Sequence, residues 1–270
     1  MNKFTILYNN STERLKLSPQ ILALSKSNQE AHFIINEIDN IDMLPMNEFY
    51  LRYLDNKLTL LQHGNPMSLN VDFLSTAMQR RIAAHQAKPA LIKAIEGRLK
   101  SPQHIFDMTA GLGSDSFMMA ARGHKIVAVE RNPYIYLIVD DALKRLADSE
   151  QAKFAKNITL IYGNAAEIAT TLLEKRLLSK PDIVYLDPMF PERHKQAKVK
   201  KNMQLLHALL STDANDEEQL VDQALTLQPK KIVVKRPRLG EMLVNQQRLK
   251  PSTQISGKSS RFDVYGTRSK

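Results

Sequence analysis

From Pro102 onward, short apolar runs alternate with amphipathic stretches of helical period, and this alternation constrains the fold more than any other feature. The apolar runs predict strands at 105–109, 125–130, 158–163, 182–187 and 231–236, with a closing pair near 253–256 and 261–267. Helices are predicted near 115–122, 132–149, 165–178 and 203–227, the last broken in two at 212–215. Strands separated by helices form a parallel sheet with helices on both faces. The chain therefore predicts an α/β fold.

The first 70 residues predict a different kind of structure, made of short strands. The clearest pair is 49–54 and 58–63, joined by Asp55-Asn56-Lys57, which is typical of a hairpin turn. We therefore expect three parts: a small β-rich N-terminal subdomain at 1–70, a helical connector at 71–101 and the α/β domain at 102–270.

The connector is predicted from its apolar spacing. Residues 71–100 are predicted to be helical, with one apolar face formed by Phe73, Leu74, Met78, Ile82 and Ala83. Pro89 is expected to end or kink this helix, and Asp72 is a candidate N-cap.

Composition narrows the class of protein. The 270 residues are 43% hydrophobic, enough for a substantial core, and contain no Cys, which excludes disulfides, Cys-type zinc sites, iron–sulfur clusters and thiol nucleophiles. We expect a reducing, cytoplasmic location, no membrane segment and no metal. The net charge of +10 favours a polyanionic partner such as nucleic acid. The sequence leaves the oligomeric state open.

The first strand-to-helix turn of the α/β domain predicts a cofactor loop. Gly111 and Gly113 allow a ligand to approach the backbone, but Phe117 stands where a dinucleotide fingerprint has its third glycine. Acids at both ends of the loop, Asp107 and Asp115, suit a cationic sulfonium cofactor with an amino-acid tail better than a diphosphate. Ser114 belongs to the same loop.

The ends of the next two strands add candidate cofactor contacts. Glu130 lies 17 residues after Gly113, where it can accept both ribose hydroxyls, although nicotinamide enzymes use the same acid. Asn132 and Pro133 after it are typical of a helix start. Asn164 is a candidate adenine contact and equally a candidate helix cap.

Seven strands that end in a hairpin are the pattern of a class I methyltransferase sheet, which is Rossmann-like. A dehydrogenase Rossmann domain is the competing interpretation. The methyltransferase interpretation predicts S-adenosylmethionine (SAM) as the cofactor.

The fourth predicted strand ends in Asp187-Pro188-Met189-Phe190-Pro191, at the sheet edge where open α/β folds bind ligands. The segment resembles the (Asn/Asp)-Pro-Pro-(Tyr/Phe) motif of amino-group methyltransferases, with Met189 in place of the second proline. The Asp187 carboxylate and the Pro188 carbonyl can accept the two N–H bonds of a planar amine, and Phe190 can stack on its ring. These three are the predicted catalytic residues. An ordinary strand exit with a surface Phe is the alternative.

Basic residues cluster near this turn and in several separate segments, and they are predicted to contact phosphate. The candidates are Arg80, Arg81, Arg193, Lys195, Lys198, Lys200, Lys201, Lys235, Arg236, Lys258 and Arg261. A solvated basic surface is the alternative.

Taken together, residues 69–265 resemble the RsmJ family, the guanine-N2 methyltransferases of small-subunit (16S) ribosomal RNA. The matching segments are Val71-Asp72-Phe73, Arg80-Arg81, 107–115, Glu130-Arg131-Asn132-Pro133, 185–191, 233–237 and Arg261-Phe262-Asp263. The resemblance implies SAM contacts at Ser114-Asp115, Glu130-Arg131, Asn164-Ala165 and Asp187. It also implies small-subunit RNA or the assembled subunit as partner.

Two other functions remain open at this point. The same turn can orient any planar amine, so methylation of adenine at N6 or of a protein amide is one alternative. Guanine is implied by the resemblance alone. The chain could also be a non-catalytic RNA-binding factor in ribosome assembly.

Overall fold

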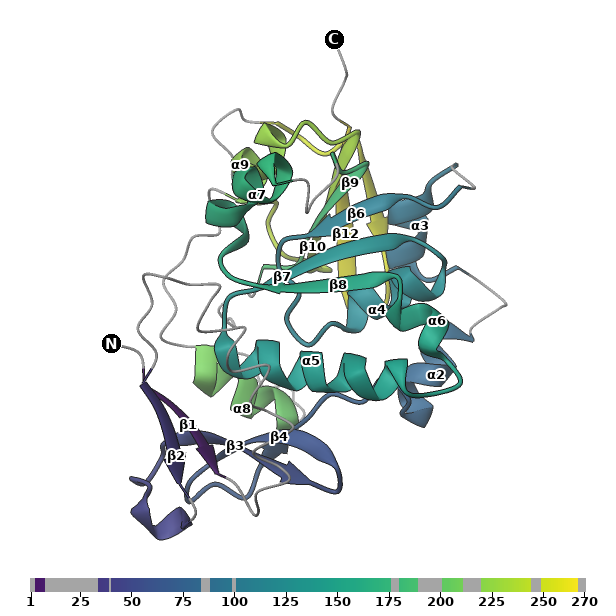
Figure 1. Ribbon diagram of the computed structural model, residues 1–270. Coiled ribbons are helices and arrows are strands. Elements are labelled where there is room, and N and C mark those ends of the chain that lie inside the picture. The colour runs from purple at the N-terminus through teal and green to yellow at the C-terminus, as the bar shows by residue number, and fades with distance from the viewer. Residues whose placement is uncertain are drawn as a thin grey trace. The chain divides into compact units, whose positions relative to one another are not determined.

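The structure is a computed structural model, and it describes residues 3–7, 34–38, 40–83, 88–98, 101–175, 180–188, 201–210, 220–243 and 249–266 (Figure 1). The chain divides into two compact units. The first comprises Met1–Asp72, Asn132–Arg145 and Pro191–Ala214, and the second Phe73–Arg131, Leu146–Phe190 and Asn215–Lys270.

A seven-stranded sheet forms the second unit and confirms the predicted class I methyltransferase type of α/β fold. Its strands are β6 (His104–Asp107), β7 (Lys125–Glu130), β8 (Ile158–Tyr162), β9 (Ile183–Leu186), β10 (Lys231–Pro237), β11 (Thr253–Ser256) and β12 (Ser260–Gly266). Their order is β11-β12-β10-β9-β6-β7-β8, with β12 antiparallel to β10 and to β11 and the other neighbours parallel. The chain order reverses between β6 and β9, and such a switch point opens a crevice at the carboxyl ends of the strands.

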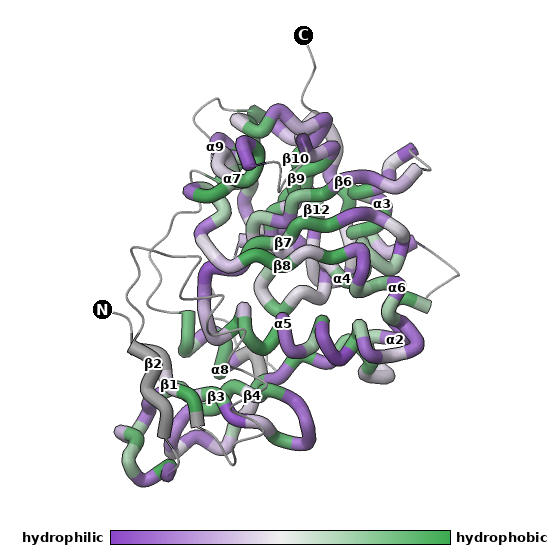
Figure 2. Tube along the Cα trace, viewed as in Figure 1, coloured by the Kyte–Doolittle hydropathy of each residue, from purple (hydrophilic) through white to green (hydrophobic). Residues whose placement is uncertain are grey.

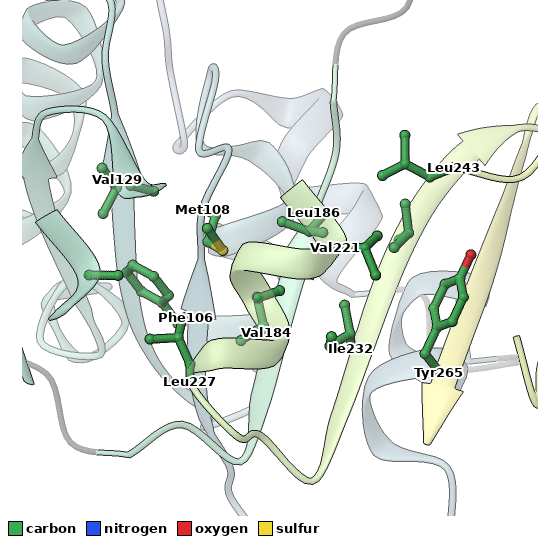
Figure 3. Close-up of a cluster of buried hydrophobic side chains, with 14 of the residues drawn as sticks. Phe106, Met108, Val129, Val184, Leu186, Val221, Leu227, Ile232, Leu243 and Tyr265 are labelled. Atoms are coloured by element: carbon green, nitrogen blue, oxygen red, sulfur yellow. The ribbon is translucent and has the colours of Figure 1, made fainter. Parts of the chain in front are cut away.

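Helices cover both faces of this sheet. Alternate residues along each strand point to opposite sides, and apolar residues on both sides need helices to pack against. On one face, Val184 and Ile232 pack with residues of α7 (Ala165–Glu174) and α9 (Leu220–Thr226) (Figures 1 and 3). On the other face, Tyr185 and Val233 pack with residues of α3 (Ala90–Glu96) and α4 (Ser114–Ala121). Figure 2 shows the apolar residues concentrated along the central strands. A short helix, α6 (Ala152–Ala155), precedes β8.

The connector forms two short helices, α2 (Thr76–Ile82) and α3, and the predicted interruption at Pro89 lies directly before the second. In α2 the N-cap is Ser75, whose Oγ accepts from the Met78 amide at 3.4 Å. Asp72, the expected cap, instead pairs with Lys57 Nζ at 2.6 Å. Pro89 is the N-cap residue of α3, at the position where the sequence predicts an interruption of the helical segment.

The first unit contains a five-stranded sheet, which confirms the predicted β-rich N-terminal subdomain. Its strands are β1 (Lys3–Leu7), β2 (Ile34–Ile38), β3 (Phe49–Leu54), β4 (Lys57–Gln62) and β5 (Ser68–Leu69), in the order β2-β1-β3-β4-β5, with a short 3-10 helix at Ile41–Met43. Strand β1 runs parallel to β2 and β3. The turn of the β3–β4 hairpin has two residues rather than three, Asp55 and Asn56, with φ of 48° and 58°.

Two helices from later in the chain share this unit, α8 (Lys201–Leu210) and most of α5 (Pro133–Ala147). Hydrogen bonds tie α5 to the sheet: Tyr134 donates its hydroxyl to the Phe49 carbonyl at 3.0 Å, and Asp141 accepts from the Leu58 amide at 3.2 Å. Asn132 caps α5 as predicted, accepting from the Tyr134 amide at 3.0 Å. The helical segment predicted at 203–227 forms two helices, α8 and α9, and the predicted break at 212–215 lies outside the described residues.

Among the described residues, no helix combines the length and the apolar character needed to cross a membrane.

Candidate active site

The carboxyl ends of three neighbouring strands bring Thr109, Asp187 and Lys235 into one row. Asp107 of β6 is paired in register with Tyr185 of β9, and Tyr185 with Val233 of β10. Thr109, Asp187 and Lys235 each lie two residues further along the chain from these three. The Asp187 amide donates to Thr109 Oγ1 at 2.6 Å, and Lys235 Nζ donates to Asp187 Oδ2 at 2.7 Å. The row lies at the switch point of the sheet, where the fold places its ligands.

Asp115 joins this row from the first turn of α4. Its Oδ2 accepts from Lys235 Nζ at 2.7 Å and from the Tyr185 hydroxyl at 2.7 Å, and its Oδ1 lies 3.5 Å from Arg81 Nη2. Lys235 therefore bridges two carboxylates that belong to different elements. We call Asp107, Asp115 and Asp187 the acidic cluster.

The acidic cluster shifts the pKa values of the groups around it. Burial lowers the pKa of Lys235, but Asp115 and Asp187 raise it more, so it lies above its ordinary value. Burial, followed by the three carboxylates, raises the pKa of Tyr185 well above its ordinary value. Lys235 is therefore an ammonium and Tyr185 a neutral hydrogen-bond donor at neutral pH.

Asp107 lies at the end of β6 and is 1% exposed. It accepts from Ser116 Oγ at 2.5 Å and from the Thr109 amide at 3.0 Å. Burial, with a smaller contribution from Asp115 and Asp187, raises the pKa of Asp107 from 3.8 to about 7, against the effect of its two hydrogen bonds. A carboxyl of this kind destabilises the fold when it ionises.

We expect Asp107→Asn to become more stable relative to wild type as the pH rises. The folded-state pKa is raised, so the stability associated with the protonated carboxyl is present below pH 4 and lost as the pH rises through about 7. Each unit of pKa difference is worth about 1.4 kcal/mol, and the asparagine side chain removes this loss. Urea unfolding at pH 5 and pH 8 measures it, with exposed Asp148→Asn as the control. A stability difference that stays constant between the two pH values would contradict the prediction.

The glycine loop adopts the backbone that the sequence predicts for a ligand-binding turn. Gly111 and Gly113 have φ of 51° and 69°, a region that favours glycine. The Gly111 amide donates to Glu130 Oε2 at 2.8 Å, which places the predicted ribose acid directly beside the loop. A Cβ added at Gly111 would meet, within 4 Å among the described residues, only the Thr109 carbonyl oxygen at 3.9 Å, so the loop leaves open space for a ligand.

The predicted cofactor residues gather at one edge of the sheet. Those at the ends of β6, β7 and β9 or in the following turns are Asp107, Gly111, Gly113, Ser114, Asp115, Glu130, Arg131 and Asp187. Asn164 follows β8 and caps α7, because its Oδ1 accepts from the Ala166 amide at 3.1 Å. Ala165 is buried beside it. The donors, carboxylates and glycine loop fit a cationic nucleoside cofactor with an amino-acid tail.

Three of the predicted phosphate-binding residues make contacts inside the protein. Lys235 lies between Asp115 and Asp187, and Arg236 is 8% exposed with its Nε donating to the Glu241 carbonyl at 2.6 Å. Arg261 makes a two-bond contact with Asp263, at 2.7 and 2.9 Å. Carboxylates and carbonyls of the protein engage these three cations, and their contact with phosphate stays a prediction.

The other basic candidates divide into exposed and undescribed residues. Arg80 and Lys258 are exposed, and so is Arg81, although it also lies near Asp115. Lys201 begins α8. The basic candidates Arg193, Lys195, Lys198 and Lys200 lie outside the described residues, as does the predicted catalytic residue Phe190.

Sequence reasoning missed two residues of this site, Thr109 and Tyr185. Thr109 links the glycine loop to Asp187, and Tyr185 links β9 to α4. Strand alternation could have indicated Tyr185, because a residue two positions before Asp187 faces the same side. Thr109 required knowledge of which strands are neighbours.

No group of three or more His, Cys, Asp or Glu side chains that could hold a metal ion occurs within the described part of the chain.

Comparison with known proteins gives concordant matches. The family described as putative SAM-dependent methyltransferases matches residues 34–267. Ribosomal RNA small subunit methyltransferase J of Francisella tularensis subsp. novicida is 42% identical over 215 residues, which cover 79% of this chain and 86% of that protein. The protein of the same name from Francisella philomiragia is 37% identical over 241 residues, 86% of this chain and 96% of that one. A crystal structure of a SAM-dependent methyltransferase from Neisseria gonorrhoeae superposes with a TM-score of 0.70 and 32% identity, covering 97% of this chain and 95% of that one.

Proposed function

This chain belongs to the family of SAM-dependent methyltransferases, and from that membership we propose that it methylates the exocyclic N2 amine of a guanine in small-subunit (16S) ribosomal RNA. The family makes it an enzyme that uses SAM. Two observations support RNA as the substrate: relatives at 42% and 37% identity are named as small-subunit ribosomal RNA methyltransferases, and the chain carries a net charge of +10.

The observation that carries the proposed chemistry is the placement of Asp187. Its backbone is anchored to Thr109 beside the glycine loop, and its side chain is 36% exposed, so a carboxylate lies at the ligand-binding edge within reach of a substrate. Burial and the neighbouring Asp115 raise the pKa of Asp187, while Lys235 lowers it. The site therefore offers a fixed acceptor for an N–H donor.

An exocyclic base amine is a weak nucleophile because its lone pair is delocalised into the ring. By accepting N–H bonds, the Asp187 carboxylate and the Pro188 carbonyl turn this lone pair out of the ring plane and stabilise positive charge that develops on nitrogen. When bound, SAM would supply the methyl group from its sulfonium and leave as S-adenosylhomocysteine, and Glu130 and the glycine loop would hold its nucleoside. The nitrogen then loses one proton, to Asp187 or to water. We propose that Phe190 stacks on the base.

The experiment that tests this proposal offers labelled SAM to the purified protein with free small-subunit RNA, assembled small subunits, DNA and protein. We expect label in N2-methylguanosine after nucleoside digestion and mass spectrometry. Label in N6-methyladenosine or in protein would contradict the guanine assignment. Absence of both cofactor binding and transfer would favour a non-catalytic assembly factor. The comparison of free RNA with assembled subunits identifies the natural substrate.

Glu130→Ala is expected to weaken binding of S-adenosylhomocysteine by roughly 10- to 100-fold. Hydrogen bonds to a charged group contribute about 1.5–3 kcal/mol, and the variant removes the acid beside the glycine loop. Isothermal titration calorimetry measures the affinity, with Glu150→Ala, an exposed acid, as the control. An unchanged affinity in a folded Glu130→Ala variant would show that this acid does not hold the ribose.

We infer a cytoplasmic location for the enzyme. Ribosomal RNA as the substrate and the absence of cysteine from the chain both support this inference.

A further inference from the structure

Lys235 lies at the centre of the candidate site but has no role in the mechanism above. Its Nζ donates to Asp115 Oδ2 and to Asp187 Oδ2, each at 2.7 Å, and its side chain is 25% exposed. Two of its three N–H bonds are thus directed at carboxylates within the protein. An RNA phosphate would have to compete with both carboxylates for this ammonium.

Asp187 is held at two points and open at a third. Its amide is bonded to Thr109, and its Oδ2 is bonded to Lys235. Among the residues that the structure describes, Oδ1 of Asp187 accepts no hydrogen bond. Because Lys235 fixes one oxygen, rotation of the carboxylate is restricted and the other oxygen is left for the substrate.

We propose that Lys235 is a positioning residue, which orients the Asp187 carboxylate and keeps it ionised so that Oδ1 can accept an N–H bond from the target amine. The proposal rests on the proposed function and deepens it. It also replaces the expected phosphate contact of Lys235 with a role inside the catalytic site.

The charges around Asp187 show why a cation is needed there. Lys235 faces it from β10, Asp115 from α4, Asp107 from β6 and Tyr185 from its own strand. Burial and Asp115 favour the protonated form of Asp187, and Lys235 is the cation that opposes them. Removal of the ammonium therefore raises the pKa of Asp187 further. A larger share of the enzyme then has an uncharged Asp187 at neutral pH.

The test compares Lys235→Met and Lys235→Arg with a matched control, Lys230→Met. Lys230 Nζ pairs with Asp182 Oδ1 at 2.7 Å. Asp182 and Lys230 directly precede β9 and β10, respectively, at the amino ends of the strands, whereas Lys235 lies toward their carboxyl ends. Steady-state methylation of small-subunit RNA gives kcat, KM for RNA, the pH profile and the salt dependence of KM. Circular dichroism verifies that each variant is folded.

We expect Lys235→Met to lower kcat about 100-fold, a loss typical of removing one preorganised group from a site of this kind. Its KM for RNA should stay within about threefold of wild type, because positioning of Asp187 is not phosphate binding. The acid limb of its kcat profile should move to higher pH. Lys235→Arg should recover most of the kcat, since it keeps a cation, and Lys230→Met should behave as wild type.

The opposite result, in which kcat is kept and binding of RNA is weakened, would overturn the inference. A folded Lys235→Met that keeps its kcat but binds RNA more weakly, with a salt slope reduced by about one, would assign Lys235 to a phosphate. If Lys235→Met does not fold, a double variant that carries both Asp115→Asn and Lys235→Met keeps the local charge balance. It is compared with the single variant Asp115→Asn. Equal kcat values in these two variants would reject the proposal. Wild type that forms N6-methyladenosine would refute the guanine assignment and still permit this comparison.

Discussion

Asp187→Ala is expected to lower kcat for RNA methylation by about 10²- to 10³-fold. The substitution removes the carboxylate that orients the amine and stabilises its developing charge, and a single preorganised group of this kind has an effect of that size. Binding of S-adenosylhomocysteine should be affected far less, because Glu130 and the glycine loop remain. Single-turnover rates with labelled SAM, combined with calorimetry for the ligand, separate the two effects.

Asp187→Asn and Asp148→Ala complete this comparison. The asparagine retains one oxygen acceptor but loses the charge, so its kcat should fall between those of wild type and Asp187→Ala. Asp148 is exposed and its alanine variant should behave as wild type. Wild-type transfer by a folded Asp187→Ala variant would refute the proposed mechanism, and wild-type function in cells without any transfer would support the assembly-factor alternative.

Arg261→Ala is expected to lower the free energy of unfolding by about 3 kcal/mol. Asp263 is 0% exposed, and Arg261 donates to both of its oxygens. Loss of one partner leaves a buried charge that is no longer balanced, and such losses typically cost about 3–5 kcal/mol. Gln254 Nε2 still donates to Asp263 Oδ1 at 2.9 Å, which places the expected loss at the lower end. Urea unfolding at neutral pH measures it.

Two further variants establish the cause of this loss. Arg261→Ala, Asp263→Asn removes the charge together with its partner and should recover part of the stability. Lys258→Ala, in the exposed turn before β12, should change the free energy of unfolding by less than about 0.5 kcal/mol. If Arg261→Ala instead weakens RNA binding at unchanged stability, the phosphate contact predicted from the sequence is correct.

The strands of the α/β domain were predictable because each is a short apolar run that is separated from the next by a turn or a helix of clear apolar period. The predicted strand at 125–130 coincides with β7, and the one at 182–187 contains β9. In the connector at 71–101, the sequence predicted helical structure and the interruption at Pro89, but not where the two helices start. Ser75 and Pro89 start two separate helices there, and a hydrophobic period carries no information about such local caps.

The sequence by itself determined which functional groups this protein can bring to a binding site. It contains a glycine loop between two acids, an acid at the end of the next strand, Glu130, and a carboxylate followed by proline at Asp187, and each depends on residues close together in the chain. Only the tertiary structure decided which cations serve that chemistry. Lys235 reaches Asp115 and Asp187 across 120 and 48 residues of sequence, and Arg261 turns to a buried Asp263. The contact of Lys235 with Asp187 follows from the register of β9 and β10, which the sequence alone does not give, whereas Arg261 and Asp263 lie two residues apart on β12.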